Sequence, residues 1–127
     1  VKIDLIVRGI CCLIPGRKYS RNIRVTRIVD TFLEHARVWY FGNGGKPKLF
    51  LGSPDWMRRN LYRRIEAVTP ILDPDLKREL SDMLSIQLSD KRKACFVDDH
   101  LRNRWKSARP QKEKIRSQYT FYEYLKG

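Results

Sequence analysis

The sequence predicts an α/β fold in which a mixed sheet is flanked by helices. Short runs of β-branched and aromatic residues alternate with one long segment of helical periodicity, which is typical of this class. Turn sequences rich in Gly, Pro, Asn and Asp separate the runs. Hydrophobic residues make up 42% of the 127 residues, which is enough for a folded core and fits one domain over residues 1–127.

The first predicted strand is Lys2–Val7, a short run rich in β-branched residues. The apolar run Ile10–Ile14 is expected to continue the strand region until Pro15-Gly16 turns the chain. After a basic loop, the apolar residues between Ile23 and Leu33 combine the period of two typical of a strand with the spacing typical of a helix. This mixture predicts a short extended entry and then a helix over about Arg27–Glu34.

The middle of the chain predicts a hairpin and one further strand. Val38–Phe41 and Lys48–Leu51 are separated by a glycine-rich turn, so we expect them to pair antiparallel. Leu61–Thr69 is predicted as a fourth strand, with Ile65 and Ala67 facing inward.

The last third of the chain is predicted to hold two helices around a short strand. Asp73-Pro74 pairs an N-cap acid with a proline at the first helical position, and leucines then repeat at helical spacing to about Ser89. Ala94–Val97 is a short predicted strand. Apolar residues from Ile115 to Leu125 form a helical stripe that is expected to dock on the body of the domain.

The charge balance indicates a phosphate-bearing partner. There are 27 Lys and Arg against 14 Asp and Glu, a net charge of +13, and arginines outnumber lysines. Arginine binds phosphate oxygens in pairs, so the candidates are nucleic acid, nucleotide, phosphate polymer and an acidic membrane surface. No apolar run is long enough to cross a bilayer, and no secretory signal is evident. A cytoplasmic location is therefore expected.

Cysteine usage favours a reducing compartment and predicts no metal site. Cys11, Cys12 and Cys95 are odd in number, and neighbouring strand residues point to opposite faces. We expect buried thiols rather than disulfides. No Cys/His cluster has the spacing of a zinc site.

Two residues stand out as candidates for chemistry. His35 lies at a predicted switch from helix to strand, where side chains emerge at the rim of a sheet, whereas His100 lies in a polar, charged run and is the weaker candidate. Arg8 ends an apolar strand and is followed by Gly9. It could form an ion pair with Asp4, or it could hold a phosphate that approaches the glycine backbone closely.

The stretch after His35 resembles the phospholipase D arrangement. That superfamily uses His-x-Lys, a strand, Gly-Ser and then Asn; here His35-x-Arg37 precedes a strand, Gly52-Ser53, and then Asp55 and Asn60. Arg37 thus replaces the usual lysine, and Asp55 falls near the usual Asn. An imidazole in such a set acts as nucleophile or general acid/base while cations and hydroxyls hold phosphoryl oxygens.

The amino-acid sequences of several stretches resemble polyphosphate kinase of the phospholipase-D-related type, and this resemblance is much more specific than the general phospholipase D pattern. The stretches, in matching order and spacing, are Asp4–Gly16, Phe32–His35, Tyr40–Gly45 and Ser53–Leu61. The resemblance runs from Lys2 to about Leu125. It implies that the chain is the second of two phospholipase-D-like halves, the C-terminal catalytic domain of a longer enzyme.

The resemblance also implies an activity and its partners. Polyphosphate kinases reversibly transfer the terminal phosphate of ATP to polyphosphate through a phosphohistidine, which belongs to the first half and is outside this chain. Arg8 and His35 would contact the phosphates of ATP or ADP, with His35 as the catalytic residue. Mg²⁺ would be bound mainly by other domains of the same polypeptide. The full enzyme would be a homo-oligomer that is cytoplasmic or associated with the inner face of the membrane.

Weaker candidates for lining the same cleft are Arg37, Ser53, Arg63 and Arg64. The basic segment Arg102–Arg116 could lie along polyphosphate or form a solvated face. The alternative function is a polyanion-binding or nucleic-acid-binding module without catalysis. Because most aromatic residues, including Trp56, are expected to pack inside, the sequence argues against specific recognition of nucleic acid.

Overall fold

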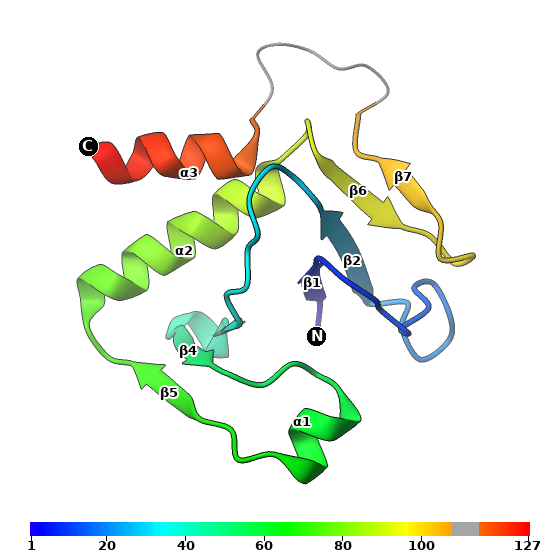
Figure 1. The fold of residues 1–127 in the computed structure, drawn as a ribbon, viewed down its shortest axis with the longest axis horizontal. Helices are drawn as coiled ribbons and strands as arrows, with labels where there is room; N and C mark the ends of the chain where they lie inside the picture. Colours follow the sequence, from blue (N-terminus) through cyan, green and yellow to red (C-terminus); the bar gives the residue numbers. More distant parts are fainter. Residues whose placement is uncertain (108–114) are drawn as a thin grey trace. The chain divides into compact units, whose positions relative to one another are not determined.

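The computed structural model describes residues 1–107 and 115–127, and these residues form two compact units. Unit 1 consists of residues 1–33 and 83–127, and unit 2 consists of residues 34–82. The chain passes from one unit to the other after Leu33 and again inside a long helix (Figure 1).

Unit 1 is built on a mixed four-stranded sheet. Its strands are β1 (Ile3–Val7), β2 (Ile23–Ile28), β6 (Ala94–Val97) and β7 (Asn103–Trp105), in the order β1-β2-β6-β7. β1 and β2 are parallel, and the other two pairings are antiparallel. The prediction of an α/β fold with a mixed sheet is therefore confirmed.

The core of unit 1 lies along the two central strands. Val25 and Ile28 of β2 and Ala94 and Val97 of β6 are almost completely buried. β-Branched residues fit this pleated, buried surface well. At the edge of the sheet, by contrast, Ile3 of β1 stays 39% exposed.

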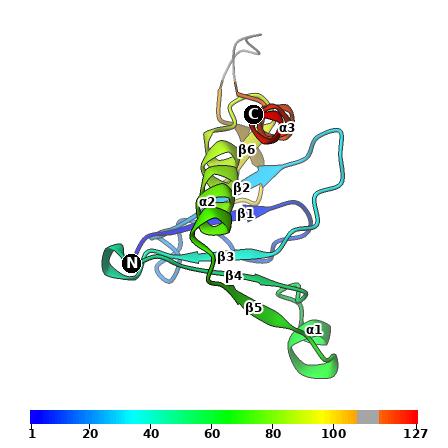
Figure 2. The ribbon, with the colours of Figure 1, turned by 90° about the vertical axis from the view of Figure 1, so that its left-hand side faces the viewer.

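Unit 2 contains a second sheet, which is antiparallel throughout. Its strands are β3 (Val38–Phe41), β4 (Lys48–Gly52) and β5 (Val68–Ile71), with β4 in the centre (Figure 2). A 3₁₀ turn, η1 (Asn43–Gly45), joins the first two, and helix α1 (Arg58–Arg63) precedes the third. The predicted hairpin is confirmed, including its glycine turn: Gly44 and Gly45 both have positive φ.

The longest helix, α2 (Pro74–Ser89), has the predicted boundaries. The Asp73 carboxylate accepts hydrogen bonds from the backbone N–H groups of Asp75, at 2.8 Å, and Leu76, at 3.0 Å. These bonds satisfy N–H groups that the first helical turn leaves without a partner.

Helix α3 (Ser117–Lys126) confirms the predicted helix but not the predicted docking. The apolar stripe stays largely exposed: Tyr122 is 58% and Leu125 is 53% exposed. Instead, the first turn is held inside unit 1, where Ser117 and Gln118 are buried. Polar contacts at the helix start, rather than the apolar stripe, anchor α3.

Two predictions in the N-terminal segment are wrong. The run Ile10–Ile14 forms no strand, and Ile10 is 94% exposed. The helix over Arg27–Glu34 does not form, because residues 23–28 are strand β2, which pairs with β1 on one side and β6 on the other. Pairing with strands distant in sequence overrides the local helical spacing.

The predicted strand Leu61–Thr69 is also wrong over most of its length. Its start belongs to helix α1, and only its last two residues lie in β5. Ile65 is fully exposed and Ala67 is exposed, so neither faces a core. The four arginines in and just before this stretch (Arg58, Arg59, Arg63 and Arg64) favour exposure to solvent over burial in a sheet.

Candidate functional site

Within unit 2, the structure brings three predicted polar residues into direct contact. An Nη2 atom of Arg37 lies 2.8 Å from Nε2 of His35, and Nη1 of Arg37 donates to the backbone oxygen of His35 at 3.3 Å. Arg37 Nε donates to Oδ1 of Asp55 at 3.0 Å. The histidine itself is exposed. The Arg37 guanidinium therefore links the candidate histidine to the Asp55 carboxylate, which lies eighteen residues after Arg37 in the sequence.

The backbone explains why these residues meet. Arg37 immediately precedes β3, and its carbonyl oxygen accepts a hydrogen bond from Gly52 N, at the end of β4. The hairpin thus places the residues before β3 beside those after β4, so that Asp55 reaches Arg37.

The charge on Asp55 is stabilised within this cluster. The hydrogen bond from Arg37 lowers the pKa of Asp55 below its ordinary value, and the positive charges of Arg37 and Arg59 act in the same direction against partial burial. The Asp55 carboxylate is accordingly ionised at neutral pH and holds the guanidinium in place.

A second cluster surrounds Glu66, which the sequence analysis did not single out. The Glu66 carboxylate accepts hydrogen bonds from the Ser53 hydroxyl and, at 2.7 Å, from the buried Asn60 amide. Arg64 Nε lies 3.5 Å from the same carboxylate. These contacts, first of all the Ser53 bond, lower the pKa of Glu66. An acid set between Ile65 and Ala67 was the available signal.

Ser53 is consequently held from several sides. Its hydroxyl donates to Glu66 and accepts from Ala67 N at 3.1 Å, while its own N–H donates to the Ala67 carbonyl at 3.0 Å. Arg64, another predicted cleft residue, shares the Glu66 carboxylate. The structure therefore joins Ser53 and Arg64 through an acid, whereas Arg37 belongs to the Asp55 cluster.

Arg8 lies in unit 1, directly after β1. β1 and β2 are parallel, so Arg8 stands at the carboxyl edge of this pair, where open α/β sheets bind ligands. Asp4 is bonded instead to Arg24, with 2.6 Å between Oδ1 and Nε. Across residues 1–107 and 115–127, Arg8 has no ion-pair partner and is exposed. The alternative of an Asp4–Arg8 pair is thus excluded.

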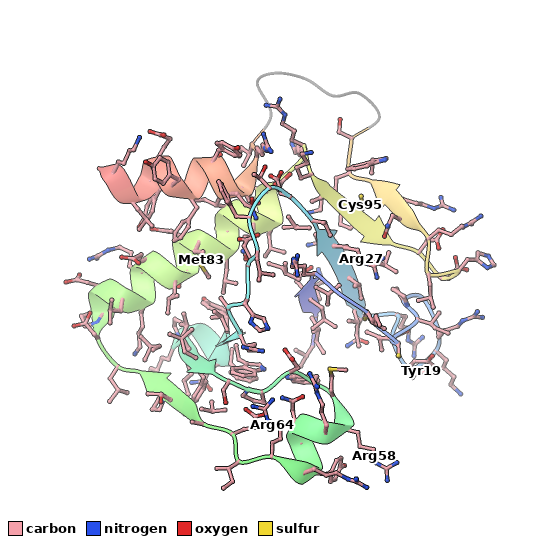
Figure 3. All side chains as sticks on the ribbon, in the orientation of Figure 1. Tyr19, Arg27, Arg58, Arg64, Met83 and Cys95 are labelled. Atoms are coloured by element: carbon pink, nitrogen blue, oxygen red, sulfur yellow. The ribbon has the colours of Figure 1, made fainter. Side chains whose placement is uncertain are left out.

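Arg63 lies apart from both acid clusters. It lines an open hollow over α1 together with Arg58, Leu61 and Tyr62. Figure 3 labels Arg58, the first residue of this helix, and Arg64, which directly follows it. Trp56 is 78% and Tyr62 is 79% exposed, so the prediction that the aromatic residues pack inside is wrong here. This surface combines cations with exposed rings.

The other predicted features fall in different places. His100 is exposed and lies 3.9 Å from Asp99, remote in sequence from both clusters. Among the cysteines, Cys95 is buried as expected, but Cys12 is exposed. Part of the basic segment Arg102–Arg116 lies outside the described residues.

In the described part of the chain, no three His, Cys, Asp or Glu side chains are grouped so that they could hold a metal ion. The Asp55 and Glu66 carboxylates are already engaged by Arg37, Ser53 and Asn60. These residues do not fit a Mg²⁺ site. None of the described helices is long and apolar enough to span a membrane.

The described residues thus define an α/β domain, in which unit 2 holds an exposed histidine bonded to arginine and a fixed serine hydroxyl, and unit 1 holds an exposed arginine at a strand edge. Comparison with known proteins is more specific. Residues 1–118 match the model of the family described as polyphosphate kinase C-terminal domain 2. The chain belongs to this family.

Named relatives agree with the family match. The chain is 47% identical over 128 residues to polyphosphate kinase of Escherichia coli (strain K12), covering 100% of this chain and 18% of that protein. It is 57% identical over 95 residues to the polyphosphate kinase of Synechocystis sp., covering 74% of this chain and 13% of that protein. The chain therefore spans less than a fifth of these relatives' length.

A solved structure supports the fold. The crystal structure of polyphosphate kinase from Porphyromonas gingivalis superposes with a TM-score of 0.94 at 57% identity, over 100% of this chain and 19% of that one. The α/β arrangement described here is therefore the one found in that structure.

Proposed function

We propose that this chain supplies nucleotide-phosphate contacts to a polyphosphate kinase that reversibly transfers the terminal phosphate of ATP to polyphosphate. The observation that carries the proposal is the family match over residues 1–118, which includes both Arg8 and His35. ATP, ADP and polyphosphate are the proposed substrates. Further domains of the same polypeptide are the proposed partners, in a homo-oligomer that is cytoplasmic or associated with the inner face of the membrane.

The proposed roles follow from position and chemistry. Arg8, exposed and unpaired in the described residues, holds β- and γ-phosphate oxygens with its guanidinium fork. His35 hydrogen-bonds the transferred phosphoryl group. Phosphoryl transfer depends mainly on positioning and on stabilising the charge of the phosphoryl oxygens, which these two side chains supply.

The fold is proposed to be phospholipase-D-like. In support, the residues of the resemblance that follow His35 lie together in unit 2: Arg37 contacts both His35 and Asp55, and Ser53 follows β4. The phosphorylated histidine is proposed to belong to the other phospholipase-D-like half, outside residues 1–127. The chain by itself should then form no phosphohistidine with ATP; labelling of the purified 127-residue chain by [γ-³²P]ATP would contradict this.

Substitutions in the full-length enzyme test the roles of Arg8 and His35. His35→Ala and Arg8→Ala should each lower the rate of polyphosphate synthesis at least about 100-fold without changing the melting temperature. Matched controls are His100→Ala and Arg21→Ala, which remove an exposed histidine and an exposed arginine outside the site. Near-normal synthesis by either site variant would refute that residue's role.

The exposed rings near α1 favour a second candidate function, binding of polyanions without catalysis. Tyr62 lines the hollow over α1 with Arg58 and Arg63, Trp56 is exposed two residues before this helix, and basic surfaces with exposed rings bind single-stranded nucleic acid. Competition between RNA and polyphosphate separates the two functions. Ready displacement by polyphosphate with steep salt dependence would show that only phosphate density is read, and retention of RNA would favour base stacking.

A further inference from the structure

The contact between Arg37 and His35 fixes which ring nitrogen carries the proton. A guanidinium has five N–H donors, no acceptor, and is not deprotonated in proteins. The Arg37 Nη2 atom, 2.8 Å from His35 Nε2, can therefore only donate. Nε2 must accept with its lone pair, which leaves the proton of the neutral ring on Nδ1.

The Arg37 side chain is fixed by further hydrogen bonds besides its contact with the His35 ring. Its Nη1 donates to the His35 backbone oxygen and its Nε to Asp55 Oδ1. The Arg37 side chain is only 23% exposed and that of Asp55 34% exposed, so both are ordered by packing as well as by hydrogen bonds. Three donor positions on one rigid plane thus hold the imidazole at one end and the carboxylate at the other.

We propose that Asp55 is a positioning residue which, through Arg37, holds His35 with Nε2 as acceptor and Nδ1–H as the donor to a phosphoryl oxygen. This inference rests on the proposed function and narrows it to one atom. No proton changes place: Nδ1–H donates a hydrogen bond whose strength grows as charge builds on the phosphoryl oxygens. Asp55 itself touches no substrate.

Two features of Asp55 support this role. The hydrogen bond from Arg37 lowers the Asp55 pKa, so its negative charge is present at neutral pH. This charge compensates the guanidinium beside His35. A residue without an acceptor oxygen at position 55 would leave Arg37 free to turn toward solvent or toward phosphate, and the imidazole would lose the donor that fixes its tautomer.

Kinetics of the full-length enzyme give the first test. Asp55→Ala should lower kcat for polyphosphate synthesis about 10-fold or more, while KM for ATP changes less than about threefold, because positioning is lost rather than a substrate contact. Asp55→Asn keeps an oxygen that can accept from Arg37 and should fall between Asp55→Ala and the unchanged enzyme. Asp4→Ala is the matched control, since Asp4 also pairs with an arginine, its carboxylate is about as exposed as that of Asp55, and it belongs to unit 1.

The ring nitrogens give the second readout, which a merely structural role would not move. In the ¹⁵N-histidine-labelled full-length enzyme, the His35 signals are identified by their loss in His35→Gln. The unchanged enzyme should show a protonated Nδ1 and an unprotonated Nε2, and Asp55→Ala should shift the proton toward Nε2. Arg37→Lys, which keeps the charge but cannot bridge both partners, should show the same shift if Asp55→Ala proves unstable.

The outcomes separate this inference from the proposed function. A proton on Nε2 in the unchanged enzyme would overturn the inference, and so would an unchanged kcat and tautomer in Asp55→Ala. Either result could coexist with an inactive His35→Ala enzyme, in which case the proposed function stands. Full activity of His35→Ala would instead defeat the proposed function itself.

Discussion

The carboxylates of the two units differ in what they hold. In unit 1, Asp30 and Asp90 bond mainly to backbone N–H groups and to Arg116, which begins the chain's last helix. In unit 2, Asp55 and Glu66 bond to the side chains that the family resemblance assigns to the site. The Asp30 side chain is 1% exposed, and Asp55 is 34% exposed.

The difference separates structural acids from acids of the site. Asp90 accepts hydrogen bonds from the backbone N–H groups of Arg92, Lys93 and Ala94 and, through its other oxygen, of Ser117 at 2.7 Å. All four of these donors are backbone groups, so the Asp90 carboxylate connects the start of α3 to the segment that follows α2. The contacts of Asp55 end at an exposed imidazole. Unit 1 acids should therefore control stability, and unit 2 acids should control activity.

The largest effect on stability is expected from Asp90→Asn. The variant keeps the shape of Asp90 but places an NH₂ group where Oδ2 accepts from Ser117, in a site that is 0% exposed. Leaving buried N–H groups unsatisfied should lower the free energy of unfolding by about 3 kcal/mol. Chemical denaturation of the 127-residue chain measures this, and a loss no larger than that of a surface variant would break the distinction between the units.

Acid titration of the same variant checks the electrostatic part of this prediction. Burial opposes the charge of Asp90, but backbone hydrogen bonds, first from Lys93 and Ser117, outweigh it and lower the pKa. The hydrogen bond from Arg116 likewise lowers the pKa of Asp30. A depressed pKa stabilises the fold above the unfolded value and is lost as pH falls. The stability gap between the unchanged chain and Asp90→Asn should therefore shrink below about pH 4.

Local signals in the sequence predicted the elements that depend on neighbouring residues. The Asp73-Pro74 helix start, the glycine turn and the hairpin are correct, because each depends on residues close in sequence. The end of strand β2 was predicted as the start of a helix, because its partners β1 and β6 are set by tertiary pairing. The second half of helix α1 was predicted as strand, since its exposed arginines carry no inward-facing pattern.

The sequence could name candidate residues for the site, but it could not name the partners that those residues contact. His35, Arg37 and Ser53 were named from their order along the chain, which the phospholipase D resemblance supplies. That Arg37 bridges His35 and Asp55 depends on strand register, which a single sequence does not fix. Glu66 was missed, because only the fold brings the side chains of Ser53 and Asn60 onto its carboxylate.

A smaller loss of stability is expected from Gly52→Ala. This variant tests whether close packing, rather than the acidic residues, stabilises unit 2. A Cβ at this position would lie 2.7 Å from the Trp39 ring and 3.0 Å from the Ala67 carbonyl oxygen. The ring must shift, which should lower the free energy of unfolding by about 1 to 2 kcal/mol. Gly9→Ala is the matched control, because a Cβ there meets nothing within 4 Å. Equal stability of the two variants would show that Trp39 yields freely.

The smallest loss of stability is expected from Asp4→Ala. This variant gives the baseline for a carboxylate that is expected to control neither stability nor activity. Asp4 pairs with Arg24 across β1 and β2, and the two side chains are 37% and 59% exposed. Exposed pairs of this kind contribute at most about 1 kcal/mol and are screened by salt. The loss in Asp4→Ala should stay below this limit and disappear at high salt, whereas the loss in Asp90→Asn should persist, because its hydrogen bonds are buried. A salt-independent loss in Asp4→Ala would place Asp4 with the structural acids of unit 1.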